Sequence, residues 1–99
     1  MPLKRLEHLN TKDCLWMYIL RILKDKPMHA YSVRKEIKKR FGFTPGTMTA
    51  YKVLYSLKTK GLVRKKIEGR KNIYSITQKG RNNLRKAIQF YRSRINLLK

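Results

Sequence analysis

Apolar residues recur at helical spacing near the start of the chain. Leu3, Leu6 and Leu9 lie three residues apart and predict a short helical arm. A second helix is predicted to begin at Thr11 or Asp13 and to end at Lys24, with apolar residues on more than one face. These residues are Leu15, Trp16, Met17, Ile19, Leu20, Ile22 and Leu23. A helix that is apolar on most sides must be covered on most sides, so we expect a second subunit to pack on it or, in a monomer, the arm and the last helix.

Two further helices are predicted in the middle of the chain. Pro27 ends the preceding helix because proline lacks an amide hydrogen, and the next helix is expected from His29 or Ala30 to Arg40. The helix after it ends at Gly61 and carries an apolar stripe at positions i, i+3, i+4 and i+7. The stripe consists of Ala50, Val53, Leu54 and Leu57.

A β-hairpin is predicted after Gly61. Residues 62–67 and 72–76 are short β-branched stretches, and the turn between them contains Gly69. The inner faces are expected to contain Val63, Ile67, Tyr74 and Ile76. Three helices followed by a hairpin and a helix form the order of a winged helix-turn-helix. We therefore expect a mostly α fold with a small β-hairpin and a long C-terminal helix.

The last predicted helix has a narrow apolar seam. Thr77 can cap its start, and the pattern reaches about Leu98. Its apolar residues are spaced four, three, four and three apart, as in a coiled coil, and such a seam needs a partner helix. The sequence thus predicts an arm and winged helix-turn-helix domain over residues 1–77 and a dimerisation helix over residues 78–99. The predicted dimer interface consists of Leu15, Trp16, Leu84, Ile88, Tyr91, Ile95 and Leu98.

The charge of the chain points to a polyanionic partner. Twenty-six Lys and Arg residues oppose five acidic residues, which gives a net charge of +21 and an isoelectric point near 10.7. Such an excess is typical of proteins that bind nucleic acid. Combined with the predicted fold, it favours double-stranded DNA.

Other classes of function find little support in the sequence. Cys14, His8 and His29 are too few for a four-ligand metal site, and an unpaired thiol argues for a reducing interior, so we expect no metal, disulfide or cofactor. The acids are scattered, no glycine-rich phosphate loop precedes a helix, and Cys14 lies on an apolar helix, so we expect no enzyme. The apolar runs are too short to cross a membrane, and residues 1–10 lack the features of a signal peptide. These patterns predict an intracellular, cytoplasmic protein.

The candidate DNA-binding residues lie on the third helix of the motif and on the hairpin. The sequence leaves the start of that helix open, because either Thr44, with Pro45 at the first helical position, or Thr47 can cap it. The exposed early residues of such a helix face the base edges of the major groove, and cations at the tip of the hairpin fit the minor groove or its phosphates. The candidates are Thr47, Thr49, Tyr51, Lys52, Tyr55, Arg70 and Lys71. Tyr55 has an alternative role, in which it braces the turn.

Three segments of the chain carry a recognisable set of motifs: Pro27-Met28-His29-Ala30-Tyr31, Thr49-Ala50-Tyr51 with its closing Gly61-Leu62-Val63, and Gly69-Arg70-Lys71 with Tyr74, Thr77 and Gly80. Through these segments most of the chain, from residue 15 to residue 84, resembles the PadR family of bacterial and archaeal transcription regulators. Ala30 replaces the glycine that is usual in the family. The resemblance implies a homodimeric repressor that pairs through its terminal and N-terminal helices. It also implies that small aromatic ligands sometimes bind between subunits, a site to which Trp16 would belong if it is not simply packed in the core or the dimer.

Two functions compete on this basis. The first is a dimeric, sequence-specific transcriptional regulator, expected to bind a palindromic site with half-sites roughly 34 Å apart. The second is a basic architectural or chromatin protein that coats DNA with little sequence preference. A regulator should prefer its operator over random duplex by roughly 10³ or more, whereas a coating protein should not.

Overall fold

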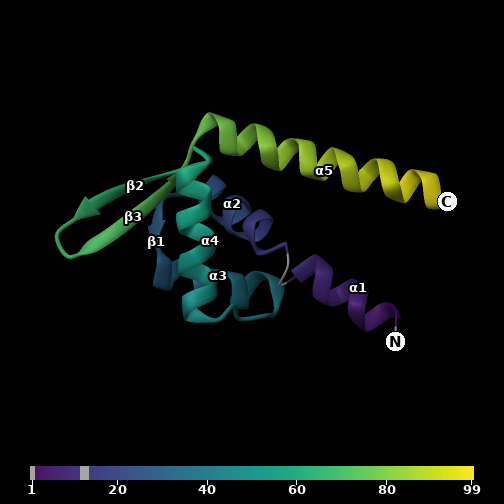
Figure 1. Ribbon diagram of the computed structural model, residues 1–99, viewed down its shortest axis with the longest axis horizontal. Helices are drawn as coiled ribbons and strands as arrows, with labels where there is room; N and C mark the ends of the chain where they lie inside the picture. Colours follow the sequence, from purple (N-terminus) through teal and green to yellow (C-terminus); the bar gives the residue numbers. More distant parts are fainter. Residues whose placement is uncertain (1, 12–13) are drawn as a thin grey trace.

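The computed structural model describes residues 2–11 and 14–99, which form five helices and three strands (Figure 1). The elements are α1 (Pro2–Thr11), α2 (Leu15–Asp25), β1 (Met28–His29), α3 (Ala30–Phe41), α4 (Thr47–Thr59), β2 (Val63–Glu68), β3 (Lys71–Ile76) and α5 (Gln78–Leu98). The predicted fold class is confirmed: three helices and a hairpin form a winged helix-turn-helix, and a long C-terminal helix follows (Figure 1). Of the two starts predicted for the second helix, Thr11 ends α1, and Asp13 lies outside the described residues.

The core forms around α2, which packs against α3, α4, α5 and β3. Ile19, Leu20 and Ile22 on α2 are fully buried, as the apolar character of most of its surface predicted. Val33 and Ile37 of α3 approach from one side and Leu54 of α4 completes the centre, all without solvent exposure. Each fully buried aliphatic side chain contributes about 1.5–3 kcal/mol, so burial of Leu54 in this centre helps to hold α4 against α2 and α3.

The sheet contains one strand that the sequence did not predict. The strand order is β1-β3-β2, with both pairs antiparallel, and Met28 of β1 lies opposite Tyr74 of β3. β1 has two residues and sits between Pro27 and α3, too short for a periodic signal. It ties the start of α3 to the base of the hairpin.

The hairpin of β2 and β3, the wing, leaves the body of the protein soon after its first residues. Val63 is buried as predicted, but the prediction that Ile67 faces the core is wrong, because its side chain is 69% exposed. The wing extends beyond the helices (Figure 1), and the residues of β2 after Val63 are exposed. Gly69 forms the turn at its tip with a φ of 61°, a backbone conformation that favours glycine.

The loop before α4 decides between the two predicted starts of that helix. α4 begins at Thr47 and Gly46 is its N-cap, so the start at Thr44 and Pro45 is wrong, and Thr47 is the first helical residue rather than the cap. Nε of Arg34 donates a hydrogen bond of 3.1 Å to the carbonyl of Pro45. This contact with α3 holds the loop and fixes where α4 begins.

The first turn of α5 is attached to the end of α4. Thr77 is the N-cap, as predicted, and its hydroxyl accepts a hydrogen bond of 3.0 Å from the amide of Gly80. The same hydroxyl donates to the carbonyl of Gly61 at 2.7 Å, and Nζ of Lys79 donates to the carbonyl of Lys60 at 2.8 Å. α5 then runs away from the body along the longest axis of the molecule (Figure 1).

The arm, α1, is connected to the body through Asn10. The hydroxyl of Tyr18 donates to the main-chain carbonyl of Asn10 at 2.5 Å, and the hydroxyl of Tyr91 donates to its side-chain Oδ1 at 2.7 Å. The end of the arm is thereby joined to both α2 and α5. The apolar residues of the arm itself, Leu3, Leu6 and Leu9, are exposed.

Candidate nucleic-acid interface

α4 presents one face to the core and the opposite face to solvent. Ala50, Leu54 and Leu57 are buried, which turns the intervening positions outward. All five α4 residues predicted to bind DNA are exposed: Thr47, Thr49, Tyr51, Lys52 and Tyr55. The side chain of Tyr55 is 69% exposed, which disfavours the alternative in which it braces the turn.

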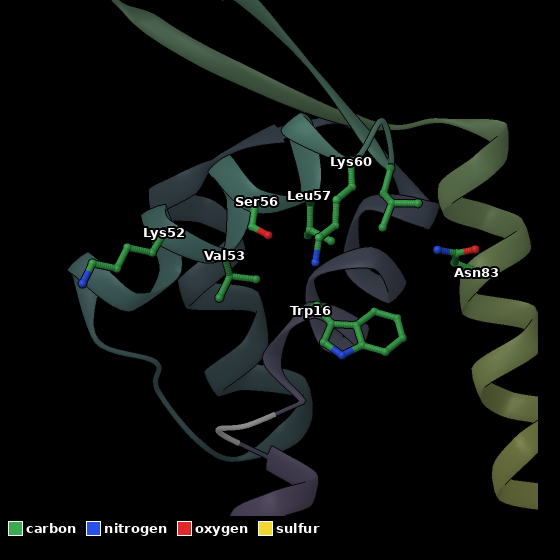
Figure 2. Close-up of a pocket in the computed structure, with 8 residues that line it drawn as sticks. Trp16, Lys52, Val53, Ser56, Leu57, Lys60 and Asn83 are labelled. Atoms are coloured by element: carbon green, nitrogen blue, oxygen red, sulfur yellow. The ribbon is translucent and has the colours of Figure 1, made fainter.

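Tyr51 and Lys52 lie on two different flanks of the exposed face. Tyr51 lines a shallow pocket on the side of the wing. Lys52 borders a second pocket, which lies between α4, α2 and α5, and Figure 2 shows its ammonium group directed away from the centre of that pocket. The face between these two flanks includes Met48 and Tyr55, so a partner of α4 meets aromatic and aliphatic surface as well as a cation.

The structure brings the predicted wing residues next to α4. Arg70, Lys71 and Tyr51 line the same pocket of about 160 Å³, together with residues from the start of α3. The residues that sequence reasoning missed here are His29, Tyr31 and Asn72. Tyr31 and Arg70 are far apart in the sequence, and no sequence pattern predicted that they line the same pocket. His29 and Tyr31 do belong to one of the segments on which the family resemblance rests.

The chemistry of this pocket suits a phosphate backbone. Arg70 and Lys71 provide positive charge, and Asn72 and the tyrosine hydroxyls can donate hydrogen bonds to phosphate oxygens. Nearby, Nζ of Lys35 lies 5.2 Å from the ring centre of Tyr31, which adds a cation at the edge. Burial, and then the neighbouring Tyr51, raise the pKa of Tyr74 at the base of the pocket, so its phenol stays neutral.

The cations of this surface are weakly neutralised by the protein itself. On the wing, Nζ of Lys66 lies 3.7 Å from a carboxylate oxygen of Glu68, and both side chains are largely exposed. An exposed pair of this kind contributes little free energy and yields readily to a competing anion. Asp25 pairs with Arg21 and Arg40 at the far ends of α2 and α3, and these hydrogen bonds lower the pKa of its carboxyl group.

The residues predicted to form a dimer interface fall into two groups. Leu15 and Leu84 are only 2% and 5% exposed and belong to the core of the single chain, since the first turns of α5 pack on α2. Trp16 and Tyr91 are half-buried, and Ile88, Ile95 and Leu98 are exposed. The seam of α5 therefore serves the core at its start and is open to solvent along the rest of the helix.

Trp16 lines the second pocket, which has a volume of about 400 Å³. Figure 2 shows the ammonium group of Lys60 directed toward the indole of Trp16, with Val53 of α4 and Asn83 of α5 beside it. The pocket is wide enough for a small planar molecule, but binding of an aromatic effector stays a prediction.

Two further sequence-based expectations concern metals and membranes. Among residues 2–11 and 14–99, no group of three or more His, Cys, Asp and Glu side chains is placed to hold a metal ion. In the same part of the chain, no helix combines the length and apolar character needed to span a bilayer. Cys14 is a free thiol, half-buried, with its sulfur 3.7 Å from the hydroxyl of Tyr91.

The fold, with an exposed helix beside a basic hairpin, defines a winged helix-turn-helix protein. Residues 19–86 match the transcriptional regulator PadR-like family. The chain therefore belongs to the PadR-like family of transcriptional regulators. A comparison with curated proteins finds no match.

Solved structures of PadR proteins share the fold. A PadR-like transcription factor from Bacteroides fragilis is 19% identical with a TM-score of 0.80, and the match covers 95% of each chain. A PadR family transcription regulator from Clostridium difficile is 21% identical with a TM-score of 0.76, covering 84% of this chain and 92% of the other. PadR of Bacillus subtilis, solved in complex with operator DNA, is 23% identical with a TM-score of 0.65, covering 75% of this chain and 46% of that longer one.

Proposed function

We propose that the protein is a homodimeric, sequence-specific DNA-binding regulator that represses transcription. In this proposal α4 lies in the major groove, and Arg70 and Lys71 of the wing contact the adjacent minor groove or its phosphates. The observation that carries the proposal is the convergence of Tyr51, Arg70 and Lys71 in one pocket beside the exposed face of α4. Two elements far apart in sequence thus present donors and cations on one continuous surface.

Pairing through α5 is the second part of the proposal. Ile95 is 52% exposed and Leu98 is 87% exposed, at helical spacing along a segment that projects from the body. An apolar seam of this kind is stabilised when two copies bury it against each other. Two copies related by a two-fold axis would present two α4 helices to half-sites roughly 34 Å apart. The family supports this assignment, and Bacillus subtilis PadR binds operator DNA.

The experiment is selection of bound genomic fragments followed by competition. A shared inverted repeat should emerge, and the protein should prefer it over random duplex by roughly 10³ or more. Tyr51→Ala with Lys52→Ala should weaken binding to the selected repeat by roughly tenfold or more, since each good base contact provides about 1–3 kcal/mol. Lys39→Ala, which removes one exposed cation from α3, is the control and should change affinity little.

A second function is favoured by one observation, the net charge of +21. A basic winged helix protein of this charge can coat DNA as an architectural protein, with affinity supplied by phosphate contacts. Selected fragments without a common repeat, together with equal affinity for random duplex, would refute the regulator and support this alternative. The salt dependence of binding does not separate the two, because both use phosphate contacts.

A further inference from the structure

Three arginines form a row along one side of α5. Arg81, Arg85 and Arg92 are separated by four and seven residues, spacings that return to the same face of an α-helix. Leu84, Ile88 and Ile95, which belong to the apolar seam, occupy the neighbouring face. Arg85 and Arg92 flank the seam, and Arg81, seven residues before Ile88, lies in line with it at the end of α5 where Leu84 packs on the core of its own chain. In a pair of α5 helices that buries Ile88 and Ile95, Arg85 and Arg92 would lie at the edge of the seam, where flanking positions carry charged side chains.

The guanidinium groups of this row are free to bind an anion. All three arginines are exposed, and none takes part in an ion pair, side-chain hydrogen bond or ring contact among the residues that the structure describes. The sequence adds to this excess: α5 carries six cations and no acidic residue. By contrast, Arg21 and Arg40 are held by Asp25.

The row lies on an element that leads away from the proposed DNA surface. Figure 1 shows the wing at one end of the longest axis and the free end of α5 at the other, and the molecule extends 50 Å in this direction. The α4 face and the wing account for DNA binding at their own end. The cations of α5 are not needed there.

The length of the row fits a duplex. At 1.5 Å per residue, Arg81 and Arg92 are separated by about 17 Å along the helix axis. A duplex carries one negative charge per roughly 1.7 Å, so about ten phosphates lie along such a length. Each arginine can form a bidentate contact with a phosphate, which lysine cannot do.

We propose that Arg81, Arg85 and Arg92 form a second DNA-binding surface, which holds a separate duplex while α4 and the wing hold the first. The protein then bridges two DNA segments. This inference rests on the proposed function, since it takes the α4 surface as already bound to DNA. It gives the charge of the chain a role beyond that of a single DNA surface.

A two-duplex capture assay tests the proposal. A biotinylated duplex carrying the selected repeat is immobilised and saturated with the full-length protein, and retention of a second, fluorescent duplex of random sequence is measured from 50 to 200 mM salt. The variant is Arg85→Gln with Arg92→Gln. The matched control is Lys86→Gln with Arg94→Gln, which removes the same charge from other faces of the same helix.

The wild type and the control should retain the second duplex, and the Arg85 and Arg92 variant should lose most of it. Loss of two phosphate contacts lowers the log–log salt slope of retention by about 1.8 for each protomer, which is roughly a 12-fold difference over this salt range. Binding to the immobilised duplex should stay within twofold for all three proteins. Thermal melting of both variants confirms that they are folded.

Three results would overturn the inference. Equal retention by the variant and the control would mean that the arginine row is not the second surface. Binding of the first duplex without retention of the second, in the wild type, would leave the proposed function intact and reject bridging. Failure of the wild type to bind the immobilised duplex would instead reject the proposed function itself, and the bridging inference with it.

Discussion

Substitution of Gly80 by alanine should destabilise the protein, against the usual trend for glycine in a helix. A Cβ atom at Gly80 would lie 2.2 Å from the carbonyl oxygen of Leu62 and 2.8 Å from Cγ1 of Ile76. The Leu62 oxygen cannot easily move, because it accepts a hydrogen bond of 3.1 Å from the amide of Thr77 and the Leu62 amide donates at 2.8 Å to Leu57. The added methyl group must therefore push α5 away from the base of the wing.

Whether Gly80→Ala raises or lowers the free energy of unfolding depends on two opposing effects, helix propensity and overpacking. Alanine favours a helix over glycine by up to about 1 kcal/mol, whereas overpacking of a tight contact costs about 1–3 kcal/mol, and contact with a fixed backbone carbonyl belongs at the upper end. We expect a net loss of about 1–2 kcal/mol. For a domain of this size, each kcal/mol lowers the melting temperature by about 4–8 °C, so the midpoint should fall by roughly 5–15 °C.

The assay is thermal or urea unfolding followed by circular dichroism, with Gly46→Ala as the control. A Cβ at Gly46 meets only the hydroxyl of Thr49, at 3.7 Å, and the φ of −61° suits alanine, so the control should change stability by less than about 1 kcal/mol. An unchanged or raised midpoint for Gly80→Ala would show that the junction is not packed as described.

Three other predictions concern the seam, the α2–α3 contact and the Trp16 pocket. Ile88→Asp with Ile95→Asp should give a monomer in analytical ultracentrifugation, because an unpaired carboxylate in an apolar interface costs several kcal/mol; a variant that still dimerises would place the interface elsewhere. Asp25 should stabilise the fold above its ordinary pKa of 3.8 and lose this effect as pH falls through its lowered folded-state pKa, because the charged carboxylate accepts more strongly from Arg21 and Arg40 than the neutral acid does. Asp25→Asn should therefore flatten the acid limb of the stability curve below about pH 4, and identical limbs for the two proteins would contradict the assignment. Planar aromatic acids should quench or shift Trp16 fluorescence if they occupy its pocket, and unchanged spectra at millimolar concentration would exclude such an effector.

Much of the fold was accessible from local patterns. The apolar stripe from Ala50 to Leu57 predicted α4, and Gly61 predicted where it ends. Both features depend only on residues within the helix or next to it, so they can be recognised in the sequence. The cap at Thr77 was equally clear, since its hydroxyl bonds an amide three residues away. By contrast, β1 depends on pairing with a strand more than forty residues later, and the exposure of Ile67 depends on where the helices end beneath the wing.

The candidate site was predicted in part for the same reason. Outward positions on α4 follow from its period, so Tyr51 and Lys52 could be identified, but their division between two flanks needed the packed structure. Tyr31 was missed because only the β1–β3 pairing brings the start of α3 to the wing. Leu84 and Ile95 follow the same heptad spacing, so the sequence did not distinguish them. In the structure Leu84 is buried in the core of its own chain, whereas Ile95 is exposed.

The hydrogen bonds from Thr77 and Lys79 to the carbonyls of Gly61 and Lys60 have a mechanical consequence. They tie the start of α5 to the end of α4, so a rotation of α5 about this junction would be passed on to α4. In the proposed dimer, a change in the angle at which two α5 helices cross would alter the separation of the two α4 helices. Operator spacing would then be set at the seam, tens of ångströms from the bases, and mutations there could retune which DNA is bound without altering any residue that touches it.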